Sequence, residues 1–269
     1  PYAAFPQRGR GVRRFAPAPD SDAGGVCDHV PVDLSIVIPA YNEERRLTLT
    51  LDGWHAWLDT FDGTAEVIVS DDGSTDGTAL LVDRHAAIDP RIRLNRLPVN
   101  AGKGAAVRAG MLAATGDYRF YVDADMNIDP FHVTPALALM ERVADVVAGK
   151  RSLAEYAGSE RSTSRMAAGA AVQVTRRLLV LPVISDTQAG FKGFRADWAE
   201  RIFAKALVDS FAFDIEVLFL ARRMGARIAE MPVSVEFRDE STFDVSKHLP
   251  PFLQDIYRIR LNAWRGRYD

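Results

Sequence analysis

The sequence predicts an α/β fold in which a mostly parallel sheet is covered by helices on both faces. Three observations predict it: short apolar runs rich in β-branched residues, segments with helical spacing, and a regular alternation of the two. Strands joined through helices in this way pair in parallel, because each crossover returns the chain to the same edge of the sheet. The expected strands are residues 34–38, 66–70, 92–95 and 118–122, and the expected helices are residues 43–58, 78–87 and 102–114.

The individual segments support this order of elements. The first run, Leu34 to Ile38, ends at Pro39 and is typical of a buried strand. The segment after it places four apolar side chains on one helical face: Leu47, Leu51, Trp54 and Leu58. The next strand precedes a helix that begins at Thr78, and a weaker strand precedes the helix that begins at Gly102. An aromatic-rich strand completes the alternation.

The composition excludes several classes of protein. Hydrophobic residues make up 48% of the 269 residues and charged residues 26%, values typical of a globular domain. The net charge of −3 argues against a dedicated nucleic-acid binder. The one cysteine, Cys27, cannot form a disulfide within the chain and fits a reducing compartment. Because the sequence shows no secretory signal and no run of about 18 apolar residues, we expect a cytoplasmic protein without a spanning helix.

Three regions of the chain differ in character. Residues 1–32 are rich in Pro, Gly and Arg and are expected to form a flexible N-terminal lead. Residues 33–240 carry the alternating strands and helices, and residues 241–269 are expected to form a loop and an amphipathic helix. That helix has an apolar stripe flanked by arginines, which suits either a peripheral membrane surface or the core. The stripe consists of Leu253, Tyr257, Leu261 and Trp264. A second apolar segment, residues 166–184, offers the same two alternatives.

Polar residues follow three of the expected strands at the point where each strand ends. These clusters are residues 39–43, 71–77 and 123–127. Ligands of open parallel sheets bind beyond the carboxyl ends of the strands, so the three clusters are expected to form one site. A single acidic turn would be ordinary turn chemistry. Three such clusters at one edge indicate a ligand.

The Asp123-Ala124-Asp125 segment is the sharpest feature of the sequence. Alternate residues of an extended segment share a face, so both carboxylates can bind one hard cation, with the amide oxygen of Asn127 as a further ligand. Mg²⁺ or Mn²⁺ suits such oxygen ligands together with a substrate diphosphate. The alternative is an acidic turn at the N-terminus of a helix, before Asp129.

The Gly-rich segment 100–106 has two interpretations. Lys103 and the amides of the helix that follows can bind a nucleotide phosphate. Alternatively, the glycines allow close packing of the backbone. The segment lacks the spacing of a P-loop or of a dinucleotide-binding motif.

The motifs of this chain occur in the order found in the family 2 inverting glycosyltransferases, which have a GT-A fold, and the sequence resembles that family. The motifs are Pro-Ala-Tyr-Asn-Glu (39–43), Asp-Asp-Gly-Ser (71–74), Asp-Ala-Asp (123–125), Asp-Thr-Gln-Ala-Gly-Phe-Lys (186–192), Phe-Asp-Ile-Glu (213–216) and Ser-Lys (246–247). The last three resemble those of the polyprenyl-phosphate sugar synthases, most of all the dolichyl-phosphate β-glucosyltransferases. The resemblance covers about residues 33–266 and implies that residues 33–240 form a GT-A catalytic domain.

The resemblance also implies a site for a nucleotide-sugar donor. The nucleoside is expected to contact Pro39, Tyr41, Glu43 and Asp72. The metal is expected to be held against the donor diphosphate by Asp123, Asp125 and Asn127. Lys247 is expected near the donor phosphates, with Arg238 in the same loop.

Two kinds of acceptor fit this site. A lipid monophosphate is already anionic near neutral pH and needs positioning by cations rather than a base. The resemblance implies Arg151 for this task, with Arg161 and Arg165 as further candidates. A hydroxyl acceptor would require a general base, for which Asp186 is the leading candidate.

We therefore expect a metal-dependent hexosyltransferase that moves glucose from a UDP-sugar donor to a polyprenyl or dolichyl phosphate. Asp186, Arg151 and Lys247 are the expected catalytic residues, while Asp214 and Glu216 are expected to orient the site. One alternative is a family 2 enzyme acting on a hydroxyl of a small molecule, saccharide or protein. Another is a module that binds a nucleotide sugar without turnover. Two departures from the family pattern, Ala189 in place of the usual Cys and a longer approach to residues 246–247, bear on the acceptor.

Overall fold

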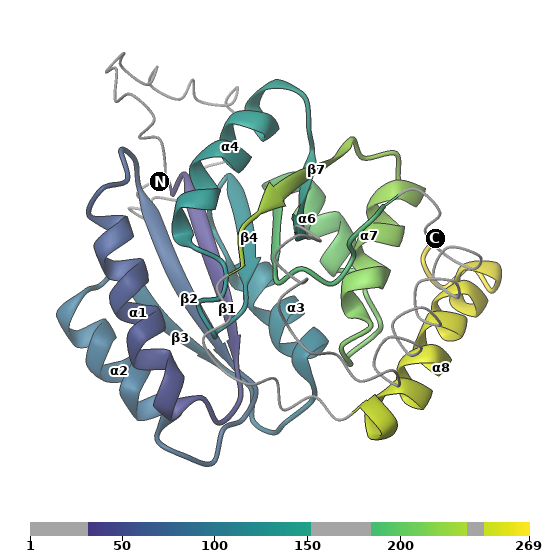
Figure 1. The fold of residues 1–269 in the computed structure, drawn as a ribbon. Coiled ribbons are helices and arrows are strands. Elements are labelled where there is room, and N and C mark those ends of the chain that lie inside the picture. Colours follow the sequence, from purple (N-terminus) through teal and green to yellow (C-terminus); the bar gives the residue numbers. More distant parts are fainter. Residues whose placement is uncertain (1–31, 152–183, 236–244) are drawn as a thin grey trace, which may run out of the picture. The chain divides into compact units, whose positions relative to one another are not determined.

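A seven-stranded sheet lies at the centre of the part of the chain that the structure describes (Figure 1). The structure is a computed structural model that describes residues 32–151, 184–235 and 245–269. The strands are β1 (Leu34–Ala40), β2 (Ala65–Asp71), β3 (Ile92–Arg96), β4 (Tyr118–Val122), β5 (Val146–Arg151), β6 (Phe191–Arg195) and β7 (Ile228–Val233). They lie side by side in the order β3-β2-β1-β4-β6-β5-β7.

The sheet is mostly parallel, as the sequence predicts. β1 pairs in parallel with β2 and β4, and β2 pairs in parallel with β3. β5 and β7 are parallel to each other, but β6 lies antiparallel between β4 and β5. The ends of β1 and β2 are in register, with Ala40 opposite Asp71. The segments that follow these two strands therefore leave the sheet at one edge.

Helices cover both faces of this sheet. They are α1 (Glu44–Leu58), α2 (Thr78–Ile88), α3 (Lys103–Ala113), α4 (Val133–Arg142), α6 (Ala196–Phe203), α7 (Phe213–Arg223) and α8 (Val245–Trp264). On one face α3 contacts α6 and α7, and α7 contacts α8. On the other face α1 contacts α2 and the 3₁₀ turn that precedes α4 (Figure 1).

The start of α3 requires a glycine. Gly102 has a φ of 105°, a conformation that residues with a side chain rarely adopt, and a Cβ there would lie 2.4 Å from the carbonyl oxygen of Asp209. The N–H of Gly104 donates to that same oxygen at 2.8 Å. The connection between α6 and α7 thus packs against the first turn of α3, and this fixes the position of Lys103.

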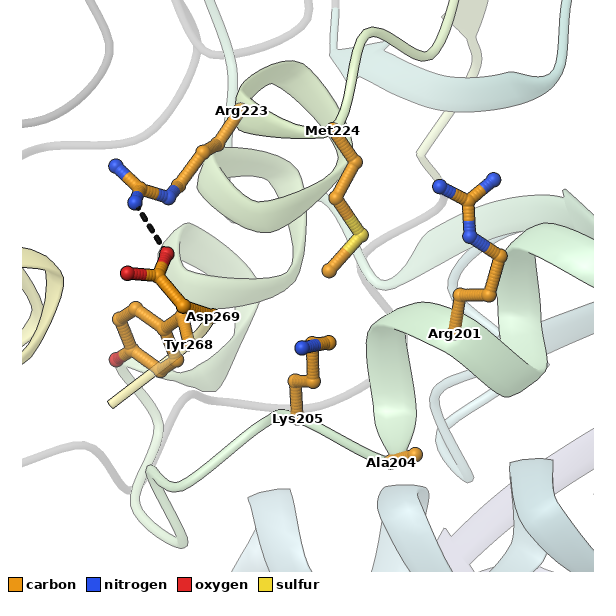
Figure 2. Close-up of a pocket in the computed structure, with 7 residues that line it drawn as sticks. All are labelled: Arg201, Ala204, Lys205, Arg223, Met224, Tyr268 and Asp269. Carbon is orange, nitrogen blue, oxygen red and sulfur yellow. Dashed lines mark hydrogen bonds and ion pairs between the residues drawn. The ribbon is translucent and has the colours of Figure 1, made fainter. Parts of the chain in front are cut away.

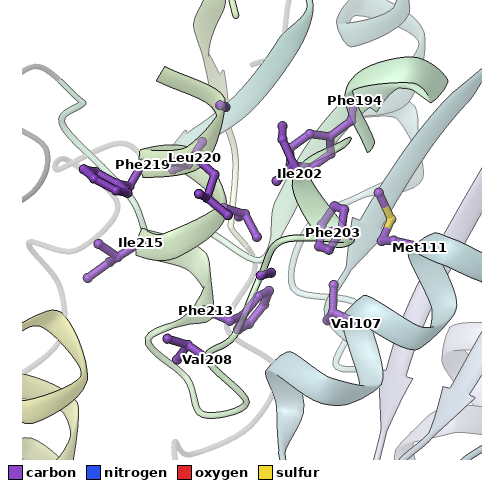
Figure 3. Close-up of a cluster of buried hydrophobic side chains, with 14 of the residues drawn as sticks. Val107, Met111, Phe194, Ile202, Phe203, Val208, Phe213, Ile215, Phe219 and Leu220 are labelled. Atoms are coloured by element: carbon purple, nitrogen blue, oxygen red, sulfur yellow. The ribbon is translucent and has the colours of Figure 1, made fainter. Parts of the chain in front are cut away.

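A hydrophobic core fills the space between the sheet and the layer of α3, α6 and α7 (Figure 3). The side chains drawn there include Val107 and Met111 from α3, Phe194 from β6, Ile202 and Phe203 from α6, and Phe213 and Leu220 from α7. All of them are almost completely buried. Burying a side chain of this size stabilises a fold by about 1.5–3 kcal/mol relative to leaving it exposed. This core holds the elements that carry the site loops.

The four strands and three helices expected from the sequence are confirmed, with small differences at their ends. β1 continues through Pro39 to Ala40, because both residues still pair with β2. Three strands and three helices that the sequence analysis did not place also form: β5, β6, β7, α4, α6 and α7. Residues 1–31, 152–183 and 236–244 lie outside the described residues, and with them the expected N-terminal lead and nearly all of the apolar segment 166–184.

α8 is amphipathic, as expected, but its buried face is not the expected stripe. Its buried apolar side chains are Phe252, Ile256, Ile259 and Ala263. Tyr257 and Trp264 of the stripe are 57% and 73% exposed. Leu253 and Leu261 of the stripe are half-buried, and Leu253 packs against the core, so the stripe is divided between the core and the surface. None of the helices in the described ranges combines the length and the hydrophobicity needed to cross a bilayer.

Candidate active site

The loops that follow β1 and β2 are joined by hydrogen bonds into one edge. The N–H of Asn42 donates to the hydroxyl of Ser74 at 2.9 Å, and the side-chain oxygen of Asn42 accepts from the N–H of Thr75 at 2.9 Å. Asn42 has a φ of 55°, which Asn tolerates better than most residues. Beside this junction Pro39 is buried and the Tyr41 ring is 43% exposed. Of these two predicted nucleoside contacts, Tyr41 is therefore the one that presents a surface.

Glu43 connects this edge with the third polar cluster. Its carboxylate accepts from the Arg46 guanidinium at 2.7 and 2.8 Å. Burial raises the pKa of Glu43 above its usual value although Arg46 opposes the shift, and the neighbouring carboxylates of Asp125 and Asp76 raise it further. A hydrogen bond from Thr50 of α1 to the carbonyl oxygen of Ala124 joins the region after β1 to the segment after β4.

Asp72 ties the second cluster to the start of α3. Its two carboxylate oxygens accept from the N–H groups of Ala101 and Gly102, each at 2.8 Å. The side chain is almost completely buried. In this structure Asp72 therefore orders the Gly-rich segment, while its contact with a base or ribose stays a prediction.

Lys103 and Asp123 form an ion pair at the centre of the edge. The Lys103 ammonium lies 2.6 Å from Oδ1 of Asp123 and 5.8 Å from the centre of the Phe211 ring. Burial alone would raise the pKa of Asp123, but the charge and hydrogen bond of Lys103 outweigh it and lower that pKa. Burial likewise opposes the charge of Lys103, and Asp123 outweighs it and raises the pKa of the lysine. Both groups are therefore charged near neutral pH.

Asp125 is a half-buried carboxylate with no ion-pair partner among the described residues. It accepts from the backbone N–H of Asn127 at 3.1 Å and from the Asn127 amide at 2.6 Å. Burial raises the pKa of Asp125, and the charge of Asp123 raises it further. A cation placed between the two aspartates would relieve both effects, since it favours the ionised forms.

This set of donors fits a hard divalent cation that also contacts a diphosphate. Such cations are bound through one or two carboxylates, and substrate phosphates and waters complete the shell. The described residues contain no group of three or more His, Cys, Asp and Glu side chains arranged as a metal site. Asp123 and Asp125 would thus hold the cation together with the substrate. A role for Asn127 as a third ligand stays a prediction.

The backbone of the Asp123–Asn127 segment is fixed from α1 by a residue that the sequence analysis missed. The hydroxyl of Thr50 donates to the carbonyl oxygen of Ala124 at 2.5 Å and is buried. Met126 has a φ of 52°. Its side chain packs against Gly53 of α1, where an added Cβ would lie 2.5 Å from Cε of Met126. A polar residue on the otherwise apolar face of the first helix was the signal that could have identified Thr50.

Arg151 and Asp186, predicted separately, form one bidentate ion pair. Nε and Nη2 of Arg151 donate to Oδ2 and Oδ1 of Asp186 at 2.7 and 2.9 Å, and the N–H of Arg151 donates to Oδ2 at 3.1 Å. Burial opposes the charge of Asp186, but the hydrogen bonds and charge of Arg151 outweigh it and lower the pKa of the carboxyl. A carboxylate held in this way is firmly ionised and is a weak proton acceptor.

Glu230 of β7 holds the Asp186 segment in place and was not predicted. One of its carboxylate oxygens accepts from the N–H and the hydroxyl of Ser185 at 2.8 and 2.6 Å and from the N–H of Asp186 at 3.2 Å. β7 is parallel to β5, the strand that ends at Arg151. The two sides of the Arg151–Asp186 pair are therefore supported by neighbouring strands.

Asp214 and Glu216, expected to orient the site, both make internal hydrogen bonds. Asp214 accepts from the Tyr121 hydroxyl at 2.7 Å and pairs with the Lys192 ammonium at 2.5 Å. Glu216 accepts from the Tyr268 hydroxyl at 2.6 Å and from two backbone N–H groups before α7. These contacts agree with a supporting role.

The side chains of four residues that the sequence analysis places near the phosphates cannot be located. Arg161, Arg165 and Arg238 lie outside the described residues. Lys247 lies in the first turn of α8, but its side chain is outside the described part of the structure. Their roles stay predictions.

A cavity of about 590 Å³ lies away from these loops, between the ends of α6 and α7 and the C-terminal residues (Figure 2). Its lining includes Arg201, Lys205, Arg223 and Asp269, and Arg223 pairs with Asp269 at 2.6 Å. Arg201 and Arg223 lie in the last turns of their helices, where a cation is stabilised by the helix dipole. The positions of these two arginines are therefore explained without a ligand.

Comparison with known proteins identifies the class. The profile of glycosyl transferase family 2 matches residues 35–203, and the chain belongs to that family. A dolichyl-phosphate beta-glucosyltransferase of Dictyostelium discoideum is 34% identical over 252 residues, which are 88% of this chain and 77% of that protein. A human protein of the same name is 30% identical over 89% of this chain and 80% of its own length. The predicted family and the prediction of a glycosyltransferase are confirmed.

Solved structures confirm the predicted GT-A fold. Mannosyl-3-phosphoglycerate synthase from Rubrobacter xylanophilus superposes with a TM-score of 0.63 at 18% identity, covering 88% of this chain and 76% of that one. Glucosyl-3-phosphoglycerate synthase from Mycobacterium tuberculosis, in complex with Mn²⁺, UDP-glucose and phosphoglyceric acid, superposes with a TM-score of 0.60 at 20% identity. That comparison covers 88% of this chain and 80% of the other.

Proposed function

We propose that this glycosyltransferase moves glucose from UDP-glucose to a polyprenyl phosphate such as dolichyl phosphate, with inversion at the anomeric carbon. The names of the relatives at 30–34% identity support the sugar and the acceptor. The bound UDP-glucose and Mn²⁺ of a structural neighbour support the donor and a divalent metal. The reaction needs an activated leaving group on the donor side and a positioned nucleophile on the acceptor side.

The pairing of Arg151 with Asp186 carries the proposal for the acceptor. A hydroxyl acceptor needs a general base, whereas a phosphate monoester has a second pKa of about 6 and is already anionic near neutral pH. Asp186 is engaged by four hydrogen bonds, from the N–H, Nε and Nη2 of Arg151 and from the N–H of Gln188. Asp186, the candidate for a general base, is therefore committed to a cation.

On the donor side the chain supplies charge at the diphosphate. A divalent cation held by Asp123 and Asp125 would neutralise the charge that develops on the departing UDP. Lys103, ion-paired with Asp123, places a further positive charge beside the same position. The Tyr41 ring and Glu43 would bind and orient the nucleoside at the neighbouring edge. Mn²⁺ and Mg²⁺ both fit oxygen donors of this kind.

On the acceptor side Arg151 would hold the lipid phosphate by charge-assisted hydrogen bonding while Asp186 accepts from its Nε and Nη2. Asp186 fixes the plane of the guanidinium, so the orientation of the incoming oxygen is set before the donor reacts. The acceptor then attacks the anomeric carbon from the face opposite to UDP, which gives inversion. No proton has to be removed from a dianionic phosphate during this step.

A lipid acceptor requires access to a membrane surface. The exposed Tyr257 and Trp264 of α8, with Arg258 and Arg265 beside them, support peripheral binding, and we propose that it takes place at the cytoplasmic face. Aromatic and basic side chains of this kind favour the interface between lipid headgroups and acyl chains.

The direct test is release of UDP from UDP-glucose by the purified chain with Mn²⁺, in the presence of a short polyprenyl phosphate or of the matching polyprenol. The expected result is strong stimulation by the phosphate, with formation of a glucosyl phospholipid, and none by the alcohol. Equal or greater stimulation by the alcohol would show that the acceptor is a hydroxyl.

A further inference from the structure

An ion pair lies in the core directly behind the candidate site. Lys192 of β6 is completely buried, and its ammonium lies 2.5 Å from Oδ1 of Asp214. The same oxygen accepts from the hydroxyl of Tyr121, which lies opposite Lys192 in the β4–β6 pairing. The ammonium also lies 5.3 Å from the centre of the Tyr121 ring. We call these three residues the Lys192 network.

Stability alone does not explain such a network. Removing two charges from water costs more than their attraction usually returns, and apolar residues of similar volume often stabilise a core equally well or better. The surrounding side chains are apolar and close-packed, and Phe194 and Phe213 lie near the Tyr121 ring. An apolar residue at position 192 would fit this environment, so the charge calls for another explanation.

The second hydrogen bond of the lysine leads to the site. The ammonium of Lys192 donates to the carbonyl oxygen of Ala189 at 2.7 Å. The next residue, Gly190, accepts from the N–H of Asp123 at 3.1 Å. Three residues before Ala189, Asp186 holds Arg151. The segment 186–190 thus touches both the proposed metal side and the proposed acceptor side, and Lys192 fixes its middle.

We propose that Lys192, with Asp214 and Tyr121, positions the segment 186–190 so that Asp123 and Arg151 keep the geometry needed for glucosyl transfer. Lys192 acts through other residues and is a positioning residue. This proposal deepens the proposed function and rests on it for the roles of Asp123 and Arg151.

The test replaces the network by apolar residues of similar volume, in the combined variant Tyr121→Phe, Lys192→Met and Asp214→Leu. Three quantities are measured: the thermal unfolding midpoint, the affinity for Mn²⁺ in the presence of UDP by electron paramagnetic resonance, and kcat with KM for each substrate. We expect an unfolding midpoint equal to or above that of the wild type. We also expect Mn²⁺ affinity and kcat to fall about 10- to 100-fold, as is typical when partners of metal ligands are removed.

Arg119→Met is the matched control. Arg119 is a buried cation of β4 whose hydrogen bonds go to Gly116, Met111 and Glu200, away from the segment 186–190. Its loss should lower the unfolding midpoint and leave the Mn²⁺ affinity unchanged. A triple variant that folds with wild-type Mn²⁺ affinity and kcat would overturn the proposal.

If the triple variant does not fold, Tyr121→Phe alone decides the matter, because it removes one hydroxyl from Asp214 and keeps the ring. A weaker Mn²⁺ affinity without a change in the unfolding midpoint supports the proposal, and unchanged affinity contradicts it. A wild-type chain that binds Mn²⁺ but transfers no glucose would contradict the proposed function instead. Comparing the Mn²⁺ affinity of wild type with that of the variants would still test the network.

Discussion

Gly190 lies so close to the carboxylate of Asp123 that no side chain can replace its hydrogen without moving one of the two residues. A Cβ at position 190 would lie 2.0 Å from Oδ2 of Asp123. The backbone hydrogen bond from Asp123 to Gly190 keeps the two residues together. The proposed metal ligand is therefore shaped by a segment that follows it by more than sixty positions in the sequence.

Gly190→Ala is expected to displace the Asp123 carboxylate. Affinity for Mn²⁺ in the presence of UDP should fall about 10- to 100-fold, with a matching loss of kcat. Gly225→Ala is the control. Gly225 lies just after α7, and a Cβ added to it would have nothing within 4 Å. That control should cost only stability, since its φ is 88°. Wild-type Mn²⁺ affinity in Gly190→Ala would contradict the placement of Asp123 at the metal.

Asp186→Asn separates a positioning carboxylate from a general base. With a polyprenyl phosphate acceptor kcat should fall by no more than about tenfold, whereas loss of a base typically costs 10²- to 10⁴-fold. KM for the acceptor should rise, because Arg151 loses its fixed orientation. Asp145→Asn is a close match in geometry: Asp145 accepts from the backbone, Nε and Nη2 of Arg227 at 2.9, 2.9 and 2.7 Å. It should leave both kinetic constants unchanged.

The pH dependence of transfer gives an independent check. The pKa of Asp186 is lowered by Arg151, so the folded protein keeps this carboxylate ionised down to pH values below its usual range. The profile of kcat/KM for a phosphate acceptor should therefore fall on the acid side near pH 6, where the phosphate itself gains a proton. Asp186→Asn should not shift that limb. A limb that disappears in Asp186→Asn would identify Asp186 as a base.

Asp89 predicts how stability depends on pH. Hydrogen bonds from Arg91 lower the pKa of Asp89 from 3.8 to about 2, against the effect of burial. The pKa of Asp89 is lower in the folded than in the unfolded chain. The ionised carboxylate therefore stabilises the fold above about pH 4, and this stabilisation is lost as the pH falls toward 2. The contribution is about 2 kcal/mol at neutral pH. Urea unfolding of wild type and Asp89→Asn at pH 7 and pH 2.5 should show a difference that shrinks in acid.

Membrane binding should depend on the exposed side of α8. Tyr257→Ser combined with Trp264→Ser should lower binding to vesicles that contain anionic phospholipid by about tenfold or more, since each aromatic ring loses burial in the interface. Ile88→Ser is the control, because Ile88 is 79% exposed on α2. Sedimentation with vesicles measures both. An equal loss of vesicle binding in the double variant and in Ile88→Ser would contradict a specific role of α8 in membrane binding.

The sequence predicted the first half of the fold well because the signals there are local. Each of β1 to β4 is a short apolar run, and the polar loops follow directly, so the edge with Asp72, Asp123 and Asp125 could be predicted. The position of β6 between β4 and β5 could not, because an antiparallel insertion depends on pairing between distant segments. Lys192 is an example: a lysine in a strand is usually solvent-exposed, and only the position of Asp214 on α7 explains its burial.

The site was predicted in its components rather than in its pairings. Arg151 and Asp186 were both identified, but their bidentate contact joins residues 35 positions apart and changes the expected role of Asp186. Lys103 was predicted to bind a phosphate, and its contact with Asp123 depends on the packing of α3 against the sheet. Glu230 was missed because hydrogen bonds to a distant backbone leave no spacing pattern in the sequence, and Thr50 was missed although it is a polar residue on an apolar helix face.

The central claim is that Asp123 and Asp125 hold the divalent cation that makes UDP a leaving group. Calorimetric titration of UDP into metal-free protein, with and without added Mn²⁺, tests it most directly when wild type and Asp125→Asn are compared. We expect Mn²⁺ to strengthen UDP binding to wild type by at least about tenfold and to have little effect on Asp125→Asn. Equal UDP affinity of the wild type with and without Mn²⁺, or full Mn²⁺ enhancement in Asp125→Asn, would contradict it.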